Sequence, residues 1–379
     1  MRKLSINQVE PGSQLAIDIK ISSPHPDTLY QLRIERGTPL TKNHLQKLEK
    51  AGREFVFIHD PETDDLEKYM FDEQIDTIEE DIEMEMKQVE NDIQSGNFKR
   101  INTKKMRKAI NELVNALKKT KTMLAFTSLK THDDYTGKHS LDVCRLTLAL
   151  VLSHKQVFAE KACAETAVDK FVTDKYILED LGIGALLHDI GKWEIPDNIL
   201  NKPGKLTEHE WEAMQKHPDI GNELLLKLQK KGLIRSPVRM PALCHHEKYG
   251  GGGYPNNLQE DQIHIYGRIT ACSDVYSALT SNRPYRVAMT PNRALQTMKE
   301  MQKQQQHFDP WVYRLFLDMV MPFPIGQEVV LSDGTRGVVC DLPGERNQPL
   351  VRVLYRGNKR LKEPYEIEAN TANAPTIVN

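Results

Sequence analysis

The sequence predicts a mainly α-helical protein, with a small mixed α/β module at its N-terminal end and a small β extension at its C-terminal end. Three observations carry this prediction. Over residues 75–93 apolar side chains recur every three or four positions, which is the period of one helix face. Residues 132–320 continue as helix-rich sequence, broken by polar loops at 201–205 and 248–257. From residue 322 the pattern changes to short strands, and Asp333-Gly334 between two of them is typical of a hairpin turn.

Length and composition argue against several classes of protein. The 379 residues predict two or three domains at about 150 residues each. Lys and Arg total 51 against 53 Asp and Glu, a net charge of −2 that argues against a DNA-binding protein, whose domain is usually basic. No apolar run approaches the roughly 18 residues of a membrane span, and the N-terminus lacks the apolar core of a signal peptide. We therefore expect a soluble, cytoplasmic chain without a membrane span.

The first predicted module covers residues 1–68. Residues 15–21 alternate in polarity like a strand, residues 41–50 have a helical pattern, and residues 55–58 form a short apolar strand. Nothing in the module has the spacing of a catalytic or metal site. We interpret it as a regulatory or docking module.

A helical hairpin is predicted over residues 69–131. Residues 72–90 hold nine carboxylates and one lysine, whereas residues 99–121 hold nine basic residues and one glutamate. An acidic helix followed by a basic helix suggests an antiparallel pair with complementary charge, and two independently solvated faces are the alternative. A homodimer formed through these helices is a further hypothesis.

The strongest sign of chemistry is a His-Asp pair, His188-Asp189, directly after the apolar run 181–187. Burying two ionisable groups is costly unless they are paired or bind a metal. Imidazole and carboxylate together suit iron, manganese or zinc. A thiolate site is not expected, because the five cysteines are odd in number and include no Cys-x-x-Cys.

Further histidines and one aspartate accompany this pair. His139 begins an apolar helical stretch, His217 precedes a proline, and Asp274 interrupts an apolar helix face. His245 and His246 are adjacent, and adjacent residues of a helix point about 100° apart, so this pair suits two different metals better than one. Each residue alone is more simply a hydrogen-bonded core residue, but five histidines and two aspartates together favour a metal centre.

The order of these motifs makes the match specific, and residues 132–320 resemble the HD-GYP family, a branch of the HD phosphohydrolases. The matching stretches are residues 133–140, 188–192, 202–207, 217–218, 245–247, 253–255, 274–280, 283–286 and 308–310. The resemblance implies an all-helical HD-type core over residues 132–321, followed by the β extension at 322–379. It also implies a metal-dependent phosphodiesterase acting on cyclic dinucleotides, typically cyclic di-GMP. The product would be linear pGpG, with further cleavage to GMP as the alternative.

The same resemblance implies roles for individual residues. Asp189 would bridge two divalent metals, iron or manganese, and a metal-bridged hydroxide would attack phosphorus. Members with a third metal use a glutamate where Tyr135 stands, so we expect a binuclear centre. The implied metal ligands are His139, His188, Asp189, His217, His245, His246 and Asp274.

Substrate contacts are implied in the same way. Lys192, four residues after His188 and so one turn along a helix, would neutralise the phosphate oxygens and act with Asp189 in catalysis. The other implied substrate-binding residues are Gly253, Tyr254, Pro255, Arg283 and Arg286. Surface salt bridges are the alternative for the two arginines.

One departure from the family pattern leaves alternatives open. Gly250 stands where the family usually has an aspartate, and the run of four glycines predicts a mobile loop. A catalytically weak protein that binds cyclic dinucleotides or docks a diguanylate cyclase is therefore one alternative. A preference for cyclic GMP-AMP is another. The intact Gly253-Tyr254-Pro255 motif argues against an unrelated nucleotide substrate.

Overall fold

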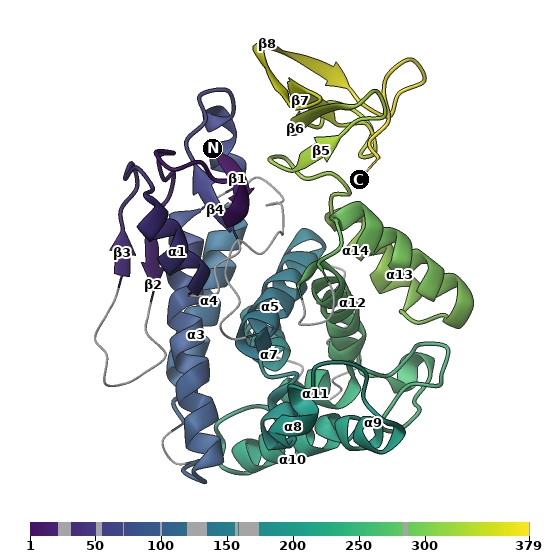
Figure 1. The fold of residues 1–379 in the computed structure, drawn as a ribbon. Coiled ribbons are helices and arrows are strands. Elements are labelled where there is room, and N and C mark those ends of the chain that lie inside the picture. Colours follow the sequence, from purple (N-terminus) through teal and green to yellow (C-terminus); the bar gives the residue numbers. More distant parts are fainter. Residues whose placement is uncertain are drawn as a thin grey trace. The chain divides into compact units, whose positions relative to one another are not determined.

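The computed structural model describes residues 1–21, 32–50, 55–70, 72–98, 101–119, 135–155, 158, 174–282 and 287–378. The chain divides into two compact units (Figure 1). One unit contains Met1–Asp72 and Pro322–Asn379, and the other contains Glu73–Met123 and Tyr135–Met321.

The N-terminal part of the first unit is a small α/β module. Strand β1 (Arg2–Ser5) pairs antiparallel with β4 (Phe55–Ile58), and β2 (Ile19–Ile21) pairs antiparallel with β3 (Leu32–Ile34). Helix α1 (Lys42–Lys50) matches the predicted helix closely. The turns η1 (Ile6–Gln8) and η2 (Asp64–Leu66) and the short helix α2 (Glu67–Met70) complete the module.

The C-terminal part of the same unit is a four-stranded antiparallel sheet. Its strands lie in the order β5 (Glu328–Val330), β6 (Thr335–Asp341), β7 (Leu350–Arg356) and β8 (Lys359–Glu368). The predicted Asp-Gly turn joins β5 to β6, with Gly334 at a φ of 81° that a side chain rarely tolerates. Asp333 accepts the backbone N–H of Thr335 at 3.0 Å and so closes the turn.

Ion pairs join the two parts of this unit across more than 250 residues of sequence. Arg352 on β7 binds both carboxylate oxygens of Asp65, at 2.8 and 3.1 Å. Arg360 on β8 lies 2.6 Å from Asp60, which is almost fully buried. The sequence alone does not predict this association, because the charged partners lie in two segments whose patterns indicate separate modules.

The described part of the second unit is all-helical, which confirms the prediction of a mainly α fold. Its longer helices are α3 (Glu73–Gln94), α4 (Thr103–Lys119), α5 (Tyr135–Ser153), α7 (Asp174–Leu186), α10 (His217–Lys230), α12 (Ile265–Thr280), α13 (Pro291–Gln305) and α14 (Pro310–Met319). The shorter elements are η3 (Ile190–Glu194), α8 (Asp197–Leu200), α9 (Glu208–Met214), η4 (Ser236–Arg239), α11 (Met240–Cys244) and η5 (Glu260–Gln262). None of the helices described here is long and apolar enough to cross a bilayer.

Local sequence explains where several of these helices begin. Pro218, Pro291 and Pro310 occupy the first turn of α10, α13 and α14, where a missing backbone N–H costs nothing. Thr207 and Glu210 form a reciprocal capping box at the start of α9.

The predicted hairpin of α3 and α4 packs against the helical core of the second unit. The two helices contact each other, and Lys105 and Glu85 form the expected kind of cross-helix ion pair at 2.8 Å. Arg145 on α5 binds the buried Glu79 of α3 at 3.1 Å. Arg107 on α4 binds the buried Glu179 of α7 at 2.7 Å. The hairpin is thus tied to the two helices that lead into the site described next; a dimer formed through it stays a prediction.

Candidate metal centre

Five segments of the helical unit bring the predicted ligands together. Helix α5 carries His139, the turn after α7 carries His188 and Asp189, and α10 begins at His217. His245 and His246 follow the end of α11, and Asp274 lies within α12. Six of the seven are buried and His246 is half-buried, so nonlocal packing and not sequence spacing creates the cluster.

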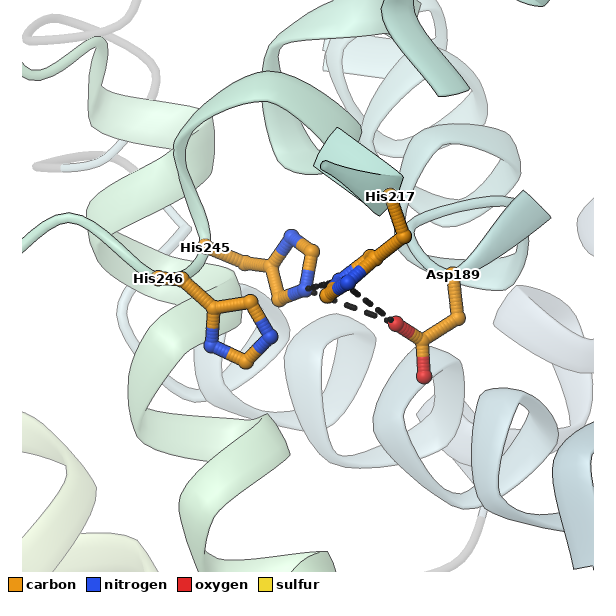
Figure 2. A group of neighbouring side chains, drawn as sticks. All are labelled: Asp189, His217, His245 and His246. Atoms are coloured by element: carbon orange, nitrogen blue, oxygen red, sulfur yellow. Dashed lines mark hydrogen bonds and ion pairs between the residues drawn. The ribbon is translucent and has the colours of Figure 1, made fainter. Parts of the chain in front are cut away.

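The ligand atoms divide into two groups. Asp189, His217, His245 and His246 each place one donor atom within 4.8 Å of the others (Figure 2). His139, His188 and Asp274 form a second group by the same measure. Two sets of nitrogen and oxygen donors of this kind suit two divalent metal ions.

Asp189 lies between the two groups. Its Oδ1 is 3.4 Å from Nε2 of His217 and 3.5 Å from Nε2 of His245. Its Oδ2 is 3.3 Å from Nε2 of His188. One carboxylate therefore directs one oxygen toward each set of histidines, which is the arrangement that a bridging ligand requires.

Three of the histidines are held by hydrogen bonds from their other ring nitrogen. Nδ1 of His188 donates to the carbonyl of Ala185 at 2.8 Å. Nδ1 of His217 and of His245 donate to backbone carbonyls at 2.7 and 2.8 Å. These bonds select the tautomer that leaves Nε2 available to a metal.

His139 is oriented differently. Its Nδ1 lies 3.0 Å from the hydroxyl of Ser277, and its Nε2 lies 2.9 Å from Asp274. A side chain thus takes the place that a backbone carbonyl takes at the other three histidines.

Burial and charge keep His217 and Asp189 in metal-binding protonation states and shift the pKa of His188 in the opposite direction. Burial lowers the pKa of His217 to about 3, so its ring is neutral. Burial raises the pKa of Asp189, but the charges of His188 and Lys192 outweigh it and hold that pKa well below its usual range. Burial lowers the pKa of His188, yet the Asp189 carboxylate outweighs it and raises that pKa overall.

Two buried atoms of this cluster lack a hydrogen bond of acceptable geometry: Nε2 of His188 and Oδ1 of Asp189. A buried polar atom without a partner costs free energy, and a bound cation would remove that cost for both. The donor set, its burial and these two atoms fit a metal centre.

Two local predictions are wrong. Helix α7 ends at Leu186, so Lys192 follows His188 through a turn and the 3₁₀ segment η3, not along an α-helix. Helix α11 ends at Cys244, so the next two residues lie in a turn and not on diverging helix faces. The His245 and His246 rings are 4.0 Å apart at their centroids and both belong to the Asp189 group.

Lys192 lies close to the cluster because it forms an ion pair with Asp189. Its Nζ lies 2.6 Å from Oδ2 of Asp189, and its side chain is 21% exposed. The ammonium therefore faces the bridging carboxylate and retains access to solvent. Arg283 and Arg286, the predicted substrate-binding arginines, lie outside the described residues.

The glycine-rich loop presents Tyr254 to the cluster. The Tyr254 ring stacks on His246 with centroids 4.6 Å apart and planes 28° apart. Glu247, almost fully buried, accepts the backbone N–H groups of Asn256 at 2.7 Å and Leu258 at 3.0 Å. A Cβ at Gly253 would lie 2.4 Å from the nitrogen of Lys248, so only glycine fits there.

Gly250 has a steric explanation. A Cβ at this position would lie 2.7 Å from the carbonyl oxygen of Gln305 and 2.9 Å from Cβ of Gln306. The backbone N–H of Gly250 donates to Gln306 at 2.9 Å, and that of Tyr249 donates to His307 at 3.1 Å. The loop is anchored to the end of α13 at this point, and an aspartate would not fit without a backbone shift.

Three side chains around the site were not predicted from the sequence: Glu247 and Ser277 next to ligands, and Trp211 next to Tyr254. Ser277 could have been found from its spacing, because it follows Asp274 by one helical turn. Trp211 lies 43 positions before Tyr254, and nothing local links the two.

Several known proteins are similar to parts of this chain. The HD domain family matches residues 142–312. The chain is 34% identical over 252 residues to a cyclic di-GMP phosphodiesterase of Pseudomonas aeruginosa, covering 66% of this chain and 55% of that protein. It is 43% identical over 132 residues to 3'3'-cGAMP-specific phosphodiesterase 2 of Vibrio cholerae, covering 35% of this chain and 24% of that one. The chain thus spans about half the length of the first relative.

A solved structure shares the fold. An HDG"Y"P protein from Bdellovibrio bacteriovorus superposes with a TM-score of 0.52 at 16% identity, covering 84% of this chain and 98% of that one. At this identity the likeness concerns the fold alone.

Proposed function

Because this chain belongs to the HD-GYP family of HD-domain proteins, we propose that it is a metal-dependent phosphodiesterase that hydrolyses cyclic di-GMP to linear pGpG, with GMP as the alternative final product. The observation that carries the proposal is the position of Asp189 between two groups of ligands, all of them buried except the half-buried His246. The relatives named as cyclic di-GMP phosphodiesterases support the choice of substrate.

Two divalent ions, iron or manganese, are the proposed cofactors. One would be held by His139, His188 and Asp274, the other by His217, His245 and His246, with Asp189 shared between them. When bound, such ions acidify a water for attack on phosphorus and neutralise the phosphate. Imidazole and carboxylate donors without thiolate suit these metals, and the described cysteines stand outside both groups.

The chain's own residues then perform three tasks. The buried hydrogen bonds from Nδ1 of His188, His217 and His245 keep their rings oriented. Lys192, held 2.6 Å from Asp189, supplies positive charge where negative charge develops on the phosphate. Gly253, Tyr254 and Pro255 form the adjoining substrate wall, since Tyr254 stacks directly on His246.

Further parts of the proposal come from the family resemblance. Arg283 and Arg286 would contact phosphate or guanine. A diguanylate cyclase would be a partner, and the chain would act in the cytoplasm.

Cyclic GMP-AMP is the second candidate substrate. Relatives that are 43% and 45% identical over 132 and 116 residues are named as cGAMP-specific phosphodiesterases. The hypothesis of a docking protein without catalytic turnover has less support. Its one argument was the glycine at position 250, and the close approach of the Gln305 carbonyl explains why a glycine is needed there.

The test is hydrolysis and metal content measured on one sample. The protein is purified without oxygen, its metals are counted, and it is incubated separately with cyclic di-GMP and cyclic GMP-AMP. We expect about two metals per chain and cleavage of cyclic di-GMP, lost in His188→Ala and retained in His209→Ala, whose imidazole is 96% exposed. Bound metal with no cleavage of either compound would overturn the proposed enzymatic activity and favour a protein that only binds cyclic dinucleotides.

A further inference from the structure

Trp211 is an exposed indole next to the candidate metal centre. It lies on α9 and is 46% exposed, unlike Trp311, which packs on Phe158 at 4.9 Å between ring centroids. Its ring centroid lies 6.1 Å from that of Tyr254, and the two planes are 80° apart. Because the planes are nearly perpendicular, Tyr254 does not stack flat on the indole. Within the described part of the chain, no aromatic ring stacks flat on Trp211.

Aromatic rings connect Trp211 to the metal ligands. Tyr254 stacks on His246 at 4.6 Å between centroids, and His246 lies 4.0 Å from His245. Tyr254 also lies 6.3 Å from His217. This row of rings runs from the exposed indole through Tyr254 to His246 and His245 of the Asp189 group. A ligand held at that group is therefore only a short row of aromatic rings away from the indole.

Helix α9 fixes the backbone position from which this indole extends. Thr207 and Glu210 cap its first turn reciprocally, and Glu210 also binds Lys202 at 2.6 Å. The backbone N–H of Tyr254 donates to the carbonyl of His246 at 3.3 Å, which fixes the neighbouring ring. A preorganised aromatic surface loses little conformational entropy when a flat ligand binds.

We propose that Trp211 is a substrate-binding residue that stacks on a purine base of the cyclic dinucleotide while a phosphate lies at the metal centre. The inference rests on the proposed function and adds a base-binding position to it. Stacking uses the flat face that every purine has, so Trp211 contributes affinity and does not distinguish guanine from adenine.

The first experiment compares steady-state kinetics of the metal-loaded full chain with its Trp211 variants. In Trp211→Ala we expect KM for cyclic di-GMP to rise on the order of 10-fold, with kcat changed less than about 3-fold. Trp211→Phe should restore most of the affinity. KM for cyclic GMP-AMP, where it is cleaved, should rise by the same factor. The matched control is Tyr365→Ala, which removes an aromatic ring that is 40% exposed on β8.

A second measurement separates base binding from damage to the metal centre. GMP carries a purine and a phosphate, whereas inorganic phosphate offers only the part that a metal centre binds. Trp211→Ala should weaken inhibition by GMP on the order of 10-fold and leave inhibition by inorganic phosphate and the metal content unchanged.

The outcomes distinguish the two proposals. A wild-type protein that cleaves neither dinucleotide overturns the proposed function before any variant is made. An active wild type whose KM is unchanged in Trp211→Ala overturns the role of Trp211 alone. Equal weakening of GMP and inorganic phosphate also overturns it, because the variant would then act through the metal centre.

Discussion

The hydroxyl of Ser277 lies 3.0 Å from Nδ1 of His139, and it is the side-chain counterpart of the backbone carbonyls that hold His188, His217 and His245. Substitution cannot remove a carbonyl, but it can remove this hydroxyl. His139 is therefore the ligand whose orientation is most open to a direct test.

Ser277→Ala should weaken metal binding at the group of His139, His188 and Asp274. Loss of such an outer partner typically lowers metal affinity by about 10-fold to 100-fold. Metal content would be measured by mass spectrometry along a chelator titration. Ser273→Ala is the matched control, because Ser273 is buried on the same helix and its hydroxyl makes no hydrogen bond. Equal retention of metal in both variants would refute the role of Ser277.

Asp189→Asn should release both metals, whereas His139→Ala should release about one. The reason is that Asp189 directs one oxygen toward each group and His139 belongs to a single group. Hydrolysis should fall by at least about 100-fold in Asp189→Asn. Asp197→Asn on α8, outside both groups, serves as the control. A full complement of metal in Asp189→Asn would contradict a shared carboxylate.

Lys192→Gln should retain both metals and KM while kcat falls on the order of 100-fold. The ammonium lies 2.6 Å from Asp189, where it can stabilise charge that develops on the phosphate. Kinetics and metal counting on one preparation would check this. The control is Lys227→Gln on the exposed face of α10. If metal content fell while kcat per metal-loaded enzyme stayed unchanged, Lys192 would only neutralise the charge of Asp189. Its proposed role in stabilising charge on the phosphate would then be refuted.

Gly250→Asp should destabilise the protein and not improve catalysis. Its Cβ would lie 2.7 Å from the carbonyl oxygen of Gln305, which is backbone and moves only with the end of α13. We expect a loss of about 1–3 kcal/mol in the free energy of unfolding, measured in urea. Gly344→Asp is the control, because no heavy atom lies within 4 Å of its Cβ position. Higher kcat at unchanged stability would show that a catalytic carboxylate had been missing.

The stability of the helical unit should decrease in mild acid because of His264. Its Nδ1 accepts the backbone N–H of Tyr266 at 3.1 Å and caps α12, which requires an unprotonated nitrogen. Burial, with a smaller effect of Arg268, lowers the pKa of His264 to about 4 from the ordinary 6.5. Between these values the unfolded chain binds a proton that the folded chain does not, so the free energy of unfolding falls as the pH is lowered from 6.5 to 4.

The loss from this residue is on the order of 3 kcal/mol at most and levels off below its folded pKa. Urea unfolding at a series of pH values would measure it. His264→Asn keeps a capping oxygen without the titration and should flatten the curve. The exposed His209→Asn should leave the curve unchanged. An identical pH dependence in His264→Asn and the wild type would refute the assignment.

Features that depend on neighbours in sequence were predictable. The apolar stripe over residues 75–93 became the buried face of α3, and Asp333-Gly334 became the turn between β5 and β6. Both follow from periodicity and local backbone preference, which need no knowledge of the rest of the chain. The seven candidate ligands were likewise identified from residue types and their order.

Predictions that assumed regular helix beyond its real end failed. The spacing from His188 to Lys192 and the divergence of His245 from His246 both presumed a helix that ends one or two residues earlier. Helix ends depend on which backbone groups find partners in the packed structure, so the sequence locates them poorly.

The sequence by itself determined the helical class of the protein, the residue types of its candidate site and its resemblance to the HD-GYP family. Tertiary structure alone decided how the two oxygens of Asp189 divide the ligands, why residue 250 is a glycine and that Trp211 stands beside Tyr254. The physical reason is the separation along the sequence over which each feature is defined. Periodicity and motifs depend on residues only a few positions apart. Distances between side chains tens of residues apart are set by how helices pack, and each packing contact depends on all the others.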